Sequence, residues 1–394
     1  MTAPTFAYLA NTLSRTSVPD GLAERYGPEA TPYQLLRALT PIAELKEKGT
    51  FFTSADMADT LWANVLDTLP PGAIVVDPAC GAGDLLFPPT RQLRGSGHPA
   101  TIRINDTDDR FARIARSRLV AAIGATNHVS LESSSDDFLV DQSLLLDATH
   151  VVLNPPFVNV AVDEVWASGK VNAAALFVTR ALSAMRTGSM LLAVLPDVLR
   201  SGSRYEAWRK AIADLGAVVE VAALGQFDAE TDVDVFKLVI IVGSARQDVA
   251  WTPQQANVNR LGDYCEVRVG PVVPHRDKEE GPDVEFITAR SLSAGATLRR
   301  RFPGRLESGP FVLVNRTSRP GENPRIRARL HLDSAPAAIE NHLIIVKPRQ
   351  ESGVACEDIL RVLADPRAVD FLDNRIRCRH LTVRAVREIP WEML

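Results

Sequence analysis

One string of residues, AlaIleValValAspProAlaCysGlyAlaGlyAspLeuLeu at 73–86, constrains the fold of this chain more than any other feature. Its apolar run predicts a buried strand, which leads through an acidic residue and a Gly-x-Gly turn into a helix. The two glycines permit a tight turn and let the backbone approach a ligand closely. A strand, a turn and a helix in this order begin a crossover unit, so the string predicts a parallel sheet.

The same alternation of short apolar runs and helical patterns continues from residue 49 to about residue 244. The strand candidates are 73–76, 101–104, 150–153, 190–195, 218–222 and 235–242. The helical segments between them include 110–122, 173–185 and 205–215. The last two strands are joined by the short segment 224–232, which predicts an antiparallel hairpin at the sheet edge. The fold class is therefore α/β, with a Rossmann-like sheet that is mostly parallel.

Three parts are expected along the 394 residues. Residues 1–48 predict a helical leader, since Thr31 and Pro32 suit a helix start. Residues 49–245 form the sheet domain, and 246–394 form a mixed α/β module whose topology the sequence does not reveal. The stretch 270–283, rich in Pro, Gly and charge, predicts a linker or a long loop.

The charge distribution separates the two larger parts. The chain has a net charge of -4, but residues 246–394 hold 24 Lys and Arg against 20 Asp and Glu, and the remainder holds 20 against 28. Residues 290–329 contain ten arginines and only two acids, Glu307 and Glu322. An acidic body with an arginine-rich module is typical of an enzyme that reads a polyanion, although a solvated basic face gives the same pattern.

The sequence also argues against several classes of protein. It contains no apolar stretch long enough to span a membrane and no secretory signal. The four cysteines, Cys80, Cys265, Cys356 and Cys378, form no Cys-x-x-Cys pair, so neither a metal site nor a disulfide framework is expected. These features predict a cytoplasmic protein.

The glycine turn predicts a cofactor other than a nucleotide phosphate. It lacks the third glycine of a dinucleotide site and the Gly-Lys-Ser/Thr of a P-loop. Asp77 suits an ammonium group, and the helix N-terminus suits a carboxylate. A zwitterion such as the methionine part of S-adenosyl-L-methionine matches both, whereas a glycine turn without a ligand is the alternative. The expected cofactor-binding residues of this loop are Asp77, Pro78, Ala79, Gly81 and Gly83.

Acidic residues further along supply candidates for the rest of the cofactor. IleAsnAspThrAsp follows the second strand, where an acid can bind a ribose diol. Asp106 is the first choice for that role and Asp108 the second. In SerAspAspPheLeu at 135–139, Asp137 can accept from the adenine amino group of the cofactor, and Phe138 can pack on its ring.

ValValLeuAsnProProPhe at 151–157 follows a strand, at the sheet edge where open α/β folds bind ligands. The Asn154 side chain and the Pro155 carbonyl can both accept from one amino group, while Pro155 and Pro156 stiffen the backbone. Two fixed acceptors localise the lone pair of an exocyclic amine toward a methyl donor. Phe157 can stack on the base. A cytosine-C5 methylase would need a Pro-Cys pair, which is missing, and Cys80 is expected to be a packed residue.

These motifs, in this order, resemble the gamma-class DNA adenine-N6 methyltransferases, which include the Taq-type enzymes and type I modification subunits. By that resemblance Thr53 in GlyThrPhePheThr touches the methionine carboxylate, and Phe51 and Phe52 line the same pocket. Phe227 in LeuGlyGlnPhe would be the partner of Phe157 around a flipped base. ProPheValLeuValAsnArgThr at 310–317 is similar to the start of the family's recognition domain. Ser54 and the Pro88–Pro89 pair depart from the family pattern.

The resemblance implies methyl transfer from S-adenosyl-L-methionine to N6 of an adenine flipped out of double-stranded DNA. It also implies that the C-terminal module recognises the target sequence. A restriction or specificity subunit is a candidate partner, and no metal is implied. An RNA or protein-glutamine methylase is an alternative, as is a degenerate DNA-binding scaffold. The arginines expected to contact DNA are Arg299, Arg300, Arg301, Arg305, Arg316 and Arg319.

Overall fold

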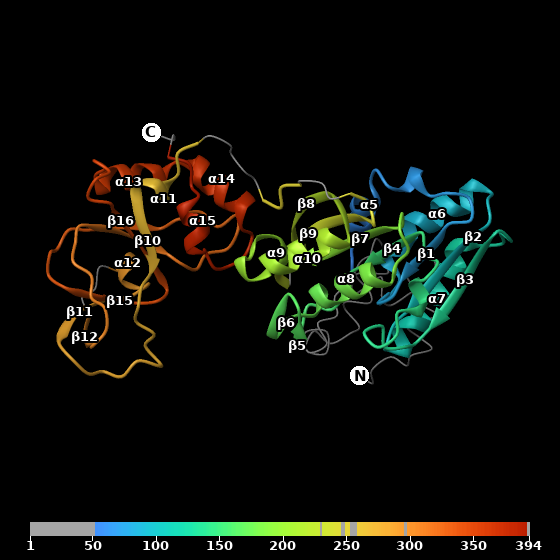
Figure 1. The fold of residues 1–394 in the computed structure, drawn as a ribbon, viewed down its shortest axis with the longest axis horizontal. Coiled ribbons are helices and arrows are strands. Elements are labelled where there is room, and N and C mark those ends of the chain that lie inside the picture. Colours follow the sequence, from blue (N-terminus) through green and yellow to red (C-terminus); the bar gives the residue numbers. More distant parts are fainter. Residues whose placement is uncertain (1–51, 229–230, 246–248, 253–257, 295–297, 392–394) are drawn as a thin grey trace, which may run out of the picture. The chain divides into compact units, whose positions relative to one another are not determined.

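A computed structural model describes residues 52–228, 231–245, 249–252, 258–294 and 298–391. The predicted helical leader 1–48 and the cofactor candidate Phe51 lie outside the described residues. The chain divides into two compact units, 1–249 and 250–394 (Figure 1). No helix within the described part of the chain is long and apolar enough to cross a membrane.

A seven-stranded sheet with the order β3-β2-β1-β4-β7-β9-β8 organises the first unit. The first five strands in this order are parallel, and β9 is antiparallel to both of its neighbours. The predicted class, a mostly parallel sheet with an antiparallel edge hairpin, is confirmed. The strands are β1 (Ile74–Asp77), β2 (Ala100–Asn105), β3 (Val129–Ser134), β4 (His150–Leu153), β7 (Met190–Pro196), β8 (Gly216–Asp228) and β9 (Thr231–Val242).

Helices cover both faces of this sheet (Figure 1). The chain runs outward from β1 to β3 and then returns to β4 on the other side of β1. Right-handed crossovers in opposite directions place their helices on opposite faces, so α6 and α7 cover one face and α8 the other. The helices are α5 (Ala55–Trp62), α6 (Phe87–Ser96), α7 (Asp109–Ile123), α8 (Ala173–Ala184), α9 (Asp197–Ser201) and α10 (Glu206–Leu215), with 3-10 turns at η1 (Leu66–Thr68), η2 (Asp84–Leu86), η3 (Ser143–Leu145) and η4 (Ser203–Tyr205).

The reversal of direction between β1 and β4 determines where a ligand can bind. In an open α/β sheet, ligands occupy the crevice beyond the carboxyl ends of the strands at such a switch point. Asp77 ends β1 and Asn154 follows β4 directly, and these two strands are paired. The topology therefore brings the two sequence motifs to one edge.

The structure corrects the predicted elements in three places. Strand β3 and the two-stranded hairpin of β5 (Asn159–Glu164) and β6 (Ala167–Asn172) were not predicted, because their residues are mostly exposed or half-buried and lack an apolar run. The predicted connection 224–232 is instead mostly strand, since β8 continues to Asp228 through three register irregularities.

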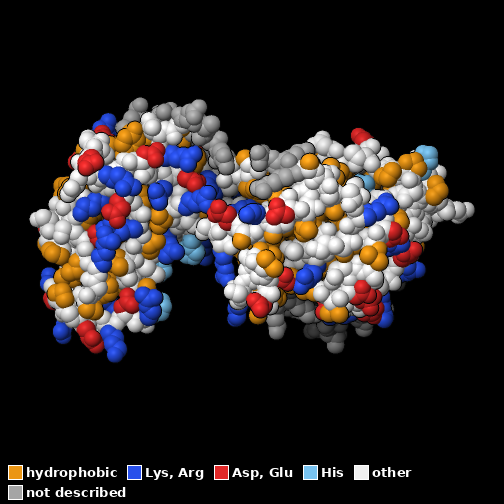
Figure 2. All heavy atoms as spheres, in the orientation of Figure 1, with side chains coloured by type: hydrophobic (Ala, Val, Ile, Leu, Met, Phe, Trp, Pro, Cys, Tyr) orange, Lys and Arg blue, Asp and Glu red, His pale blue; other side chains and the backbone are white. Residues whose placement is uncertain are grey.

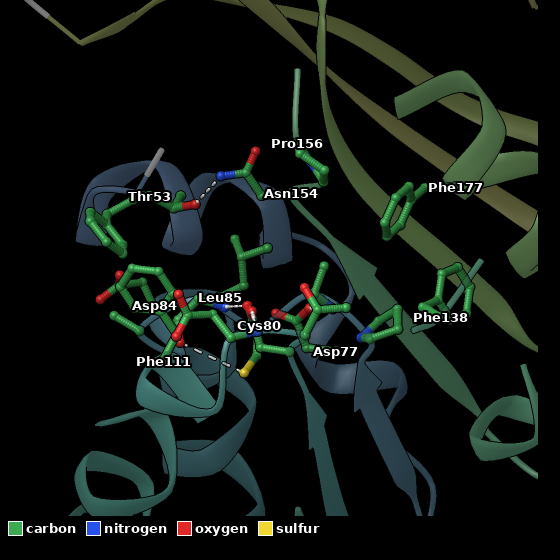
Figure 3. A pocket seen from close by; sticks show the side chains of 18 of the residues that line it. Thr53, Asp77, Cys80, Asp84, Leu85, Phe111, Phe138, Asn154, Pro156 and Phe177 are labelled. Atoms are coloured by element: carbon green, nitrogen blue, oxygen red, sulfur yellow. Dashed lines mark hydrogen bonds between the residues drawn. The ribbon is translucent and has the colours of Figure 1, made fainter. Parts of the chain in front are cut away.

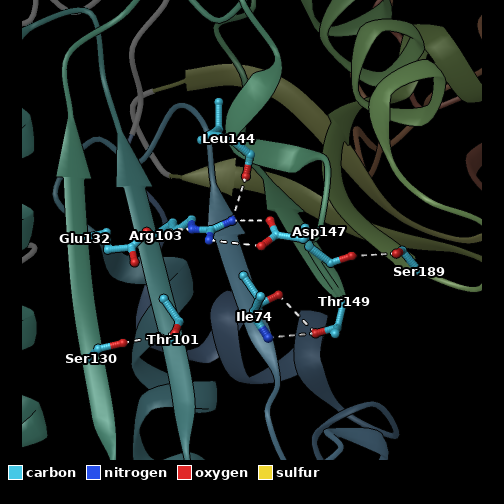
Figure 4. A network of polar contacts seen from close by, with 10 residues as sticks. Ile74, Thr101, Arg103, Ser130, Glu132, Leu144, Asp147, Thr149 and Ser189 are labelled. Atoms are coloured by element: carbon cyan, nitrogen blue, oxygen red, sulfur yellow. Dashed lines mark hydrogen bonds and ion pairs between the residues drawn. The ribbon is translucent and has the colours of Figure 1, made fainter.

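Side-chain hydrogen bonds tie neighbouring strands together (Figure 4). The Thr149 hydroxyl bonds to both the N–H and the carbonyl oxygen of Ile74, each at 3.0 Å. Ser189 Oγ donates to the carbonyl oxygen of Ala148. Arg103 on β2 bonds to Glu132 of β3 at 2.7 Å and also pairs with Asp147. The Thr149 and Ser189 bonds lie at the amino ends of β4 and β7, away from the edge that carries the motifs. The Arg103–Glu132 bond lies past the middle of β2 and β3.

The second unit is mixed α/β, as predicted. A four-stranded antiparallel sheet has the order β10-β16-β13-β14, and a three-stranded sheet has the order β12-β11-β15. Its strands are β10 (Cys265–Val269), β11 (Asp283–Ile287), β12 (Leu298–Arg301), β13 (Phe311–Asn315), β14 (Ala328–His331), β15 (Ala337–Ile339) and β16 (Leu343–Pro348). Its helices are α11 (Leu261–Tyr264), α12 (Ser291–Ala294), α13 (Cys356–Ala364), α14 (Pro366–Arg375) and α15 (Val383–Arg387).

The predicted linker or loop at 270–283 is a loop inside this second unit. Val272 is fully buried and bridges to Glu340, and the Val273 N–H donates to the Asp277 carboxylate at 2.8 Å. The segment is therefore an ordered connection between β10 and β11, because Val272 is buried and the backbone is hydrogen-bonded.

Candidate functional site

The glycine loop after β1 is built by backbone geometry that glycine favours. Gly81 and Gly83 have φ values of 51° and 81°. A Cβ on Gly83 would lie 3.1 Å from the Cβ of Ala115, so this glycine lets α7 approach the loop. Gly83 does not line the cavity described below, so its contact with a cofactor stays a prediction. Pro88 and Pro89 occupy the first turn of α6, after the 3-10 turn η2, where a missing N–H costs little.

Asp77 lies at the bottom of this loop with only 1% of its surface exposed. Its Oδ1 accepts a hydrogen bond from the Ala79 N–H at 3.1 Å. Burial raises the pKa of Asp77 to about 8; the hydrogen bond from Ala79 opposes the shift, and Asp106 and Asp84 add to it. Because a buried carboxylate is stabilised most by a nearby positive charge, this position favours a cationic ligand.

Two further acids surround the loop. Asp106 Oδ2 accepts from the Gly81 N–H and its Oδ1 accepts from the Asp108 N–H, both at 2.9 Å. Asp106 lines the cavity described below, where a ligand hydroxyl can reach its carboxylate. Asp84 is paired with buried Arg118 at 2.8 Å, and burial raises the pKa of Asp84 despite this ion pair.

A cavity of about 480 Å³ opens at this edge of the sheet (Figure 3). This volume is within the usual range for small-molecule sites. Aromatic rings line it, with Phe52 and Phe111 in edge contact at 5.4 Å and Phe138 and Phe177 at 5.3 Å. The predicted residues that line the cavity are Phe52, Thr53, Asp77, Pro78, Ala79, Gly81, Asp106, Phe138, Asn154 and Pro156.

Asn154 and Thr53, which are 101 residues apart, meet in this cavity. The Asn154 Nδ2 donates to the Thr53 hydroxyl at 2.9 Å. Figure 3 shows the amide nitrogen directed at Thr53 and the amide oxygen on the opposite side. The hydrogen bond therefore sets the orientation of the acceptor oxygen that the catalytic hypothesis requires.

Thr53 is placed by helix α5, which begins two residues later. Ser54, one of the departures from the family pattern, caps this helix by accepting from the Met57 N–H at 3.3 Å. At the other end of α5, the Trp62 indole N–H donates to the Leu85 carbonyl oxygen at 2.7 Å. Thr53 is thus fixed relative to the glycine loop.

The aromatic pair expected around a flipped base is in direct contact in this structure. The ring centroids of Phe157 and Phe227 are 5.9 Å apart, with an interplanar angle of 83°. Phe227 is 5% exposed and belongs to the hydrophobic core. Two rings that sandwich a base must be roughly parallel and about 7 Å apart, twice the usual stacking distance. The expected sandwich is therefore absent from this arrangement, because Phe227 points from β8 into the core.

Two other predicted residues do not line the cavity. Asp137 is exposed, and its Oδ1 accepts from the Leu139 N–H at 2.9 Å. Pro155 is buried and is not among the residues that line the cavity. The expected contact of Asp137 with the adenine of a cofactor is therefore not supported by its position, because its side chain turns back onto its own backbone.

The predicted DNA-binding arginines differ from one another in their surroundings. Arg300 is 7% exposed, stacks on Phe286 at 5.5 Å and bonds to the carbonyl oxygen of Asp277 at 2.5 Å. This burial contradicts the expected DNA contact by Arg300. Arg299, Arg301, Arg305 and Arg319 are exposed, and Arg316 is half-buried.

The match to a known family decides which of the sequence hypotheses applies. The sequence pattern of N-6 DNA methylases matches residues 33–243, which is more than half of the chain. The chain belongs to the N-6 DNA methylase family. This match spans Thr53, the glycine loop and the AsnProProPhe loop of the methylase.

No curated protein matches this methylase. Among solved structures, the type IIG restriction endonuclease BpuSI is 13% identical, with a TM-score of 0.48, over 91% of this chain and 60% of that one. The methyltransferase subunit of a type I restriction-modification system from Streptococcus thermophilus is 18% identical, with a TM-score of 0.41, over 49% and 45%. The type I EcoKI M protein is 17% identical, with a TM-score of 0.40, over 60% and 53%. The methylase thus spans about half to three fifths of the length of these proteins.

Sequence analysis missed several residues that shape the methylase site. Phe111 and Phe177 come from helices whose inward faces were not assigned. Asn105, 1% exposed, donates to the carbonyl oxygens of Pro78 and Asp136 at 3.0 Å each, and so ties the glycine loop to the segment after β3. Its place in IleAsnAsp, directly before Asp106, was the available signal.

Asn172 was also missed, and it joins the AsnProProPhe loop to α8. Its Oδ1 caps α8 by accepting from the Ala174 N–H at 3.0 Å, and its Nδ2 donates to the Phe157 carbonyl oxygen at 3.1 Å. Its own N–H donates to the Tyr205 hydroxyl at 2.9 Å. One buried amide therefore holds the end of the loop against a helix.

Proposed function

We propose that this methylase transfers a methyl group from S-adenosyl-L-methionine to N6 of an adenine in double-stranded DNA, within a restriction-modification or related defence system. The observation that carries the proposal is the meeting of Asn154 and Thr53 in a cavity that also contains Asp77. The proposal extends to a cytoplasmic location and to a restriction or specificity subunit as a partner.

The residues of the cavity fit this cofactor. S-adenosyl-L-methionine carries positive charge on its ammonium and sulfonium groups, and Asp77, Asp84 and Asp106 surround the loop. Asp77 would bind the ammonium group, Thr53 the carboxylate and Asp106 the ribose, while Phe138 would pack on the adenine ring. When bound, the cofactor supplies an electrophilic methyl group.

The chain supplies orientation and electrostatic stabilisation. Asn154 Oδ1 and the Pro155 carbonyl oxygen accept hydrogen bonds from the target amino group, which concentrates its lone pair on the nitrogen. The Thr53 hydroxyl holds the Asn154 amide in the required rotamer through the 2.9 Å bond. The target base must leave the duplex, which costs a few kcal/mol, and Phe157 stacks on it.

The test is methyl transfer by the purified full chain from cofactor labelled in its methyl group. Unmethylated genomic DNA, total RNA and a protein extract serve as parallel substrates, and digestion to nucleosides identifies the product. We expect label only in DNA, as N6-methyldeoxyadenosine. Label in RNA or in protein glutamine, or in cytosine, would overturn the proposal, as would a lack of heat when the cofactor is titrated calorimetrically.

Replacing Asn172 with aspartate should separate loop positioning from folding. Aspartate still caps α8 but has no N–H to donate to the Phe157 carbonyl oxygen, so one hydrogen bond of about 0.5–1.5 kcal/mol is lost. We expect kcat/KM for methyl transfer to fall about threefold to tenfold, with cofactor affinity preserved and the melting temperature lowered by only a few degrees. The matched control is Asn159→Asp, because Asn159 is exposed and faces Asn172 across the base of the hairpin. Equal losses in both variants would refute the positioning role.

A further inference from the structure

The arginines of the second unit fall into two groups according to their partners. Blue and red side chains intermingle on the visible face of this unit (Figure 2). Arg299 pairs with Asp283 at 2.8 Å, and Arg305 pairs with Glu307 at 3.0 Å. Both arginines are 61% exposed, but a carboxylate already neutralises each of them.

Arg316 and Arg327 form the second group. Among the described residues neither makes an ion pair with an acid. Arg316 Nη1 donates to the Asn341 carbonyl oxygen at 3.0 Å, and Arg327 Nη2 approaches the Thr317 carbonyl oxygen at 3.5 Å. Both partners are neutral backbone oxygens, so the two guanidinium groups keep their full positive charge.

A buried asparagine brings these two arginines together. Asn315 ends β13 and is 3% exposed. Its Nδ2 donates to the carbonyl oxygens of Thr317 and Arg325 at 3.1 Å each, and its Oδ1 accepts from the Arg327 N–H at 2.6 Å. The backbone that carries Arg316 and Arg327 is therefore fixed before any ligand binds.

Arg325 anchors the same turn from inside. Its side chain is fully buried, pairs with Asp373 at 2.7 Å and donates to the Ile376 carbonyl oxygen at 2.6 Å. The positive charge of Arg325 is therefore paired inside the fold with the negative charge of Asp373. The rest of the turn carries Arg316, Arg319 and Arg327 and one exposed acid, Glu322, whose Oε2 accepts from the Arg319 N–H at 2.8 Å.

His380 completes the cluster from the segment before α15. His380 is exposed, and its Nδ1 lies 3.2 Å from the Thr317 hydroxyl. Partial burial lowers the pKa of His380, and the positive charges of Arg316, Arg379 and His342 lower it further. The nearby acid Glu340 is 3.2 Å from His342 and also accepts from the Ala289 N–H at 2.8 Å. The electrostatic potential around His380 is therefore positive.

We propose that Arg316 and Arg327, with Thr317 and His380 between them, contact backbone phosphates of duplex DNA. Guanidinium, hydroxyl and imidazole groups are the donors that bind phosphate oxygens, and phosphate contacts fix a protein's register on a duplex. The inference rests on the proposed function for its choice of DNA as the polyanion. Of the arginines expected to contact DNA it keeps Arg316, and it adds Arg327 in place of the ion-paired Arg299 and Arg305.

The salt dependence of DNA binding tests the assignment. Each phosphate contact contributes roughly 0.9 to the slope of log affinity against log salt. For Arg316→Gln with Arg327→Gln, we expect the slope measured on a duplex to fall by about 1.8, with cofactor affinity unchanged. The matched control is Arg299→Gln with Arg305→Gln, two exposed arginines that are ion-paired, for which we expect the wild-type slope.

The outcomes separate this inference from the proposed function. If the wild-type chain neither binds duplex DNA nor methylates it, the proposed function fails first. If the wild type methylates DNA but only the Arg299 and Arg305 variant loses slope, the phosphate assignment is wrong and the proposed function stands. An unchanged slope in the Arg316 and Arg327 variant, with its melting temperature preserved, overturns the assignment as well. Loss of binding to single-stranded RNA alone would do the same.

Discussion

Replacing Asn154 with alanine is expected to reduce the rate of methyl transfer about 10²- to 10³-fold, as loss of one preorganised hydrogen-bonding group does in other enzymes. Alanine removes the acceptor oxygen that would concentrate the lone pair of the target amine. It also removes the donor to the Thr53 hydroxyl, 2.9 Å away. Because that second bond is neutral, its loss should weaken cofactor binding no more than about tenfold.

Single-turnover methyl transfer at saturating cofactor and DNA measures the first effect, and calorimetric titration of the cofactor measures the second. Asn159→Ala is the matched control, since Asn159 is exposed on β5 only five residues further along. Activity above a few per cent of wild type in Asn154→Ala would show that this amide does not act on the amine. A loss of cofactor binding as large as the loss of rate would mean that Asn154 belongs to the cofactor site alone.

The parallel sheet and its two loops could be predicted because each rests on a strong local pattern. The apolar run before Asp77 and the one before Asn154 are central strands, buried on both faces, and such strands are continuous apolar stretches. Their meeting at one edge follows from the topology of an open sheet. Strand β3 escaped prediction because it is an edge strand whose residues are mostly polar.

The functions of neighbouring arginines could not be predicted, because they depend on a strand that the sequence did not reveal. On β12, Arg299 and Arg301 are exposed and Arg300 is buried, as expected when side chains alternate between the faces of a sheet. Arg316 and Arg327 are eleven residues apart in sequence. Only the pairing of β13 with β14 and the hydrogen bonds of Asn315 bring them together.

Phe227 illustrates a different limit of motif-based prediction. The LeuGlyGlnPhe segment was expected to present an aromatic ring to a base, on the basis of similarity to a family motif. Strand β8 instead continues through the segment, and Phe227 packs in the core against Phe157. A short motif indicates which residue types are present, but the face on which each side chain lies is decided by strand register, here altered by the irregularities of β8.

Replacing Asp77 with asparagine should weaken cofactor binding and stabilise the chain without cofactor. Asparagine keeps the oxygen that accepts from the Ala79 N–H but cannot become negative. Loss of a charge-assisted bond to the cofactor's ammonium group, about 1.5–3 kcal/mol, corresponds to a roughly 10- to 100-fold higher Kd. Asparagine also removes the cost of ionising a carboxyl that is 1% exposed, so the melting temperature of the cofactor-free chain should rise.

Cofactor affinity and folding stability should both depend on pH, in directions that follow from the pKa of Asp77. The pKa of Asp77 is about 8 in the folded chain, above its ordinary value of 3.8. The contribution of Asp77 to the free energy of unfolding is therefore complete below pH 3.8 and is lost as the pH rises to 8. Over the same range the carboxylate forms, so cofactor affinity in the wild type should increase from pH 6 to pH 8, where the α-amino group of the cofactor begins to lose its own proton. Calorimetry at several pH values, with thermal melts alongside, measures both trends. In Asp77→Asn both should flatten, because the titrating group is gone. If the wild-type affinity does not change with pH, or if the variant binds as tightly as the wild type, Asp77 does not bind the ammonium group and the acidic loop serves only to hold the glycine turn.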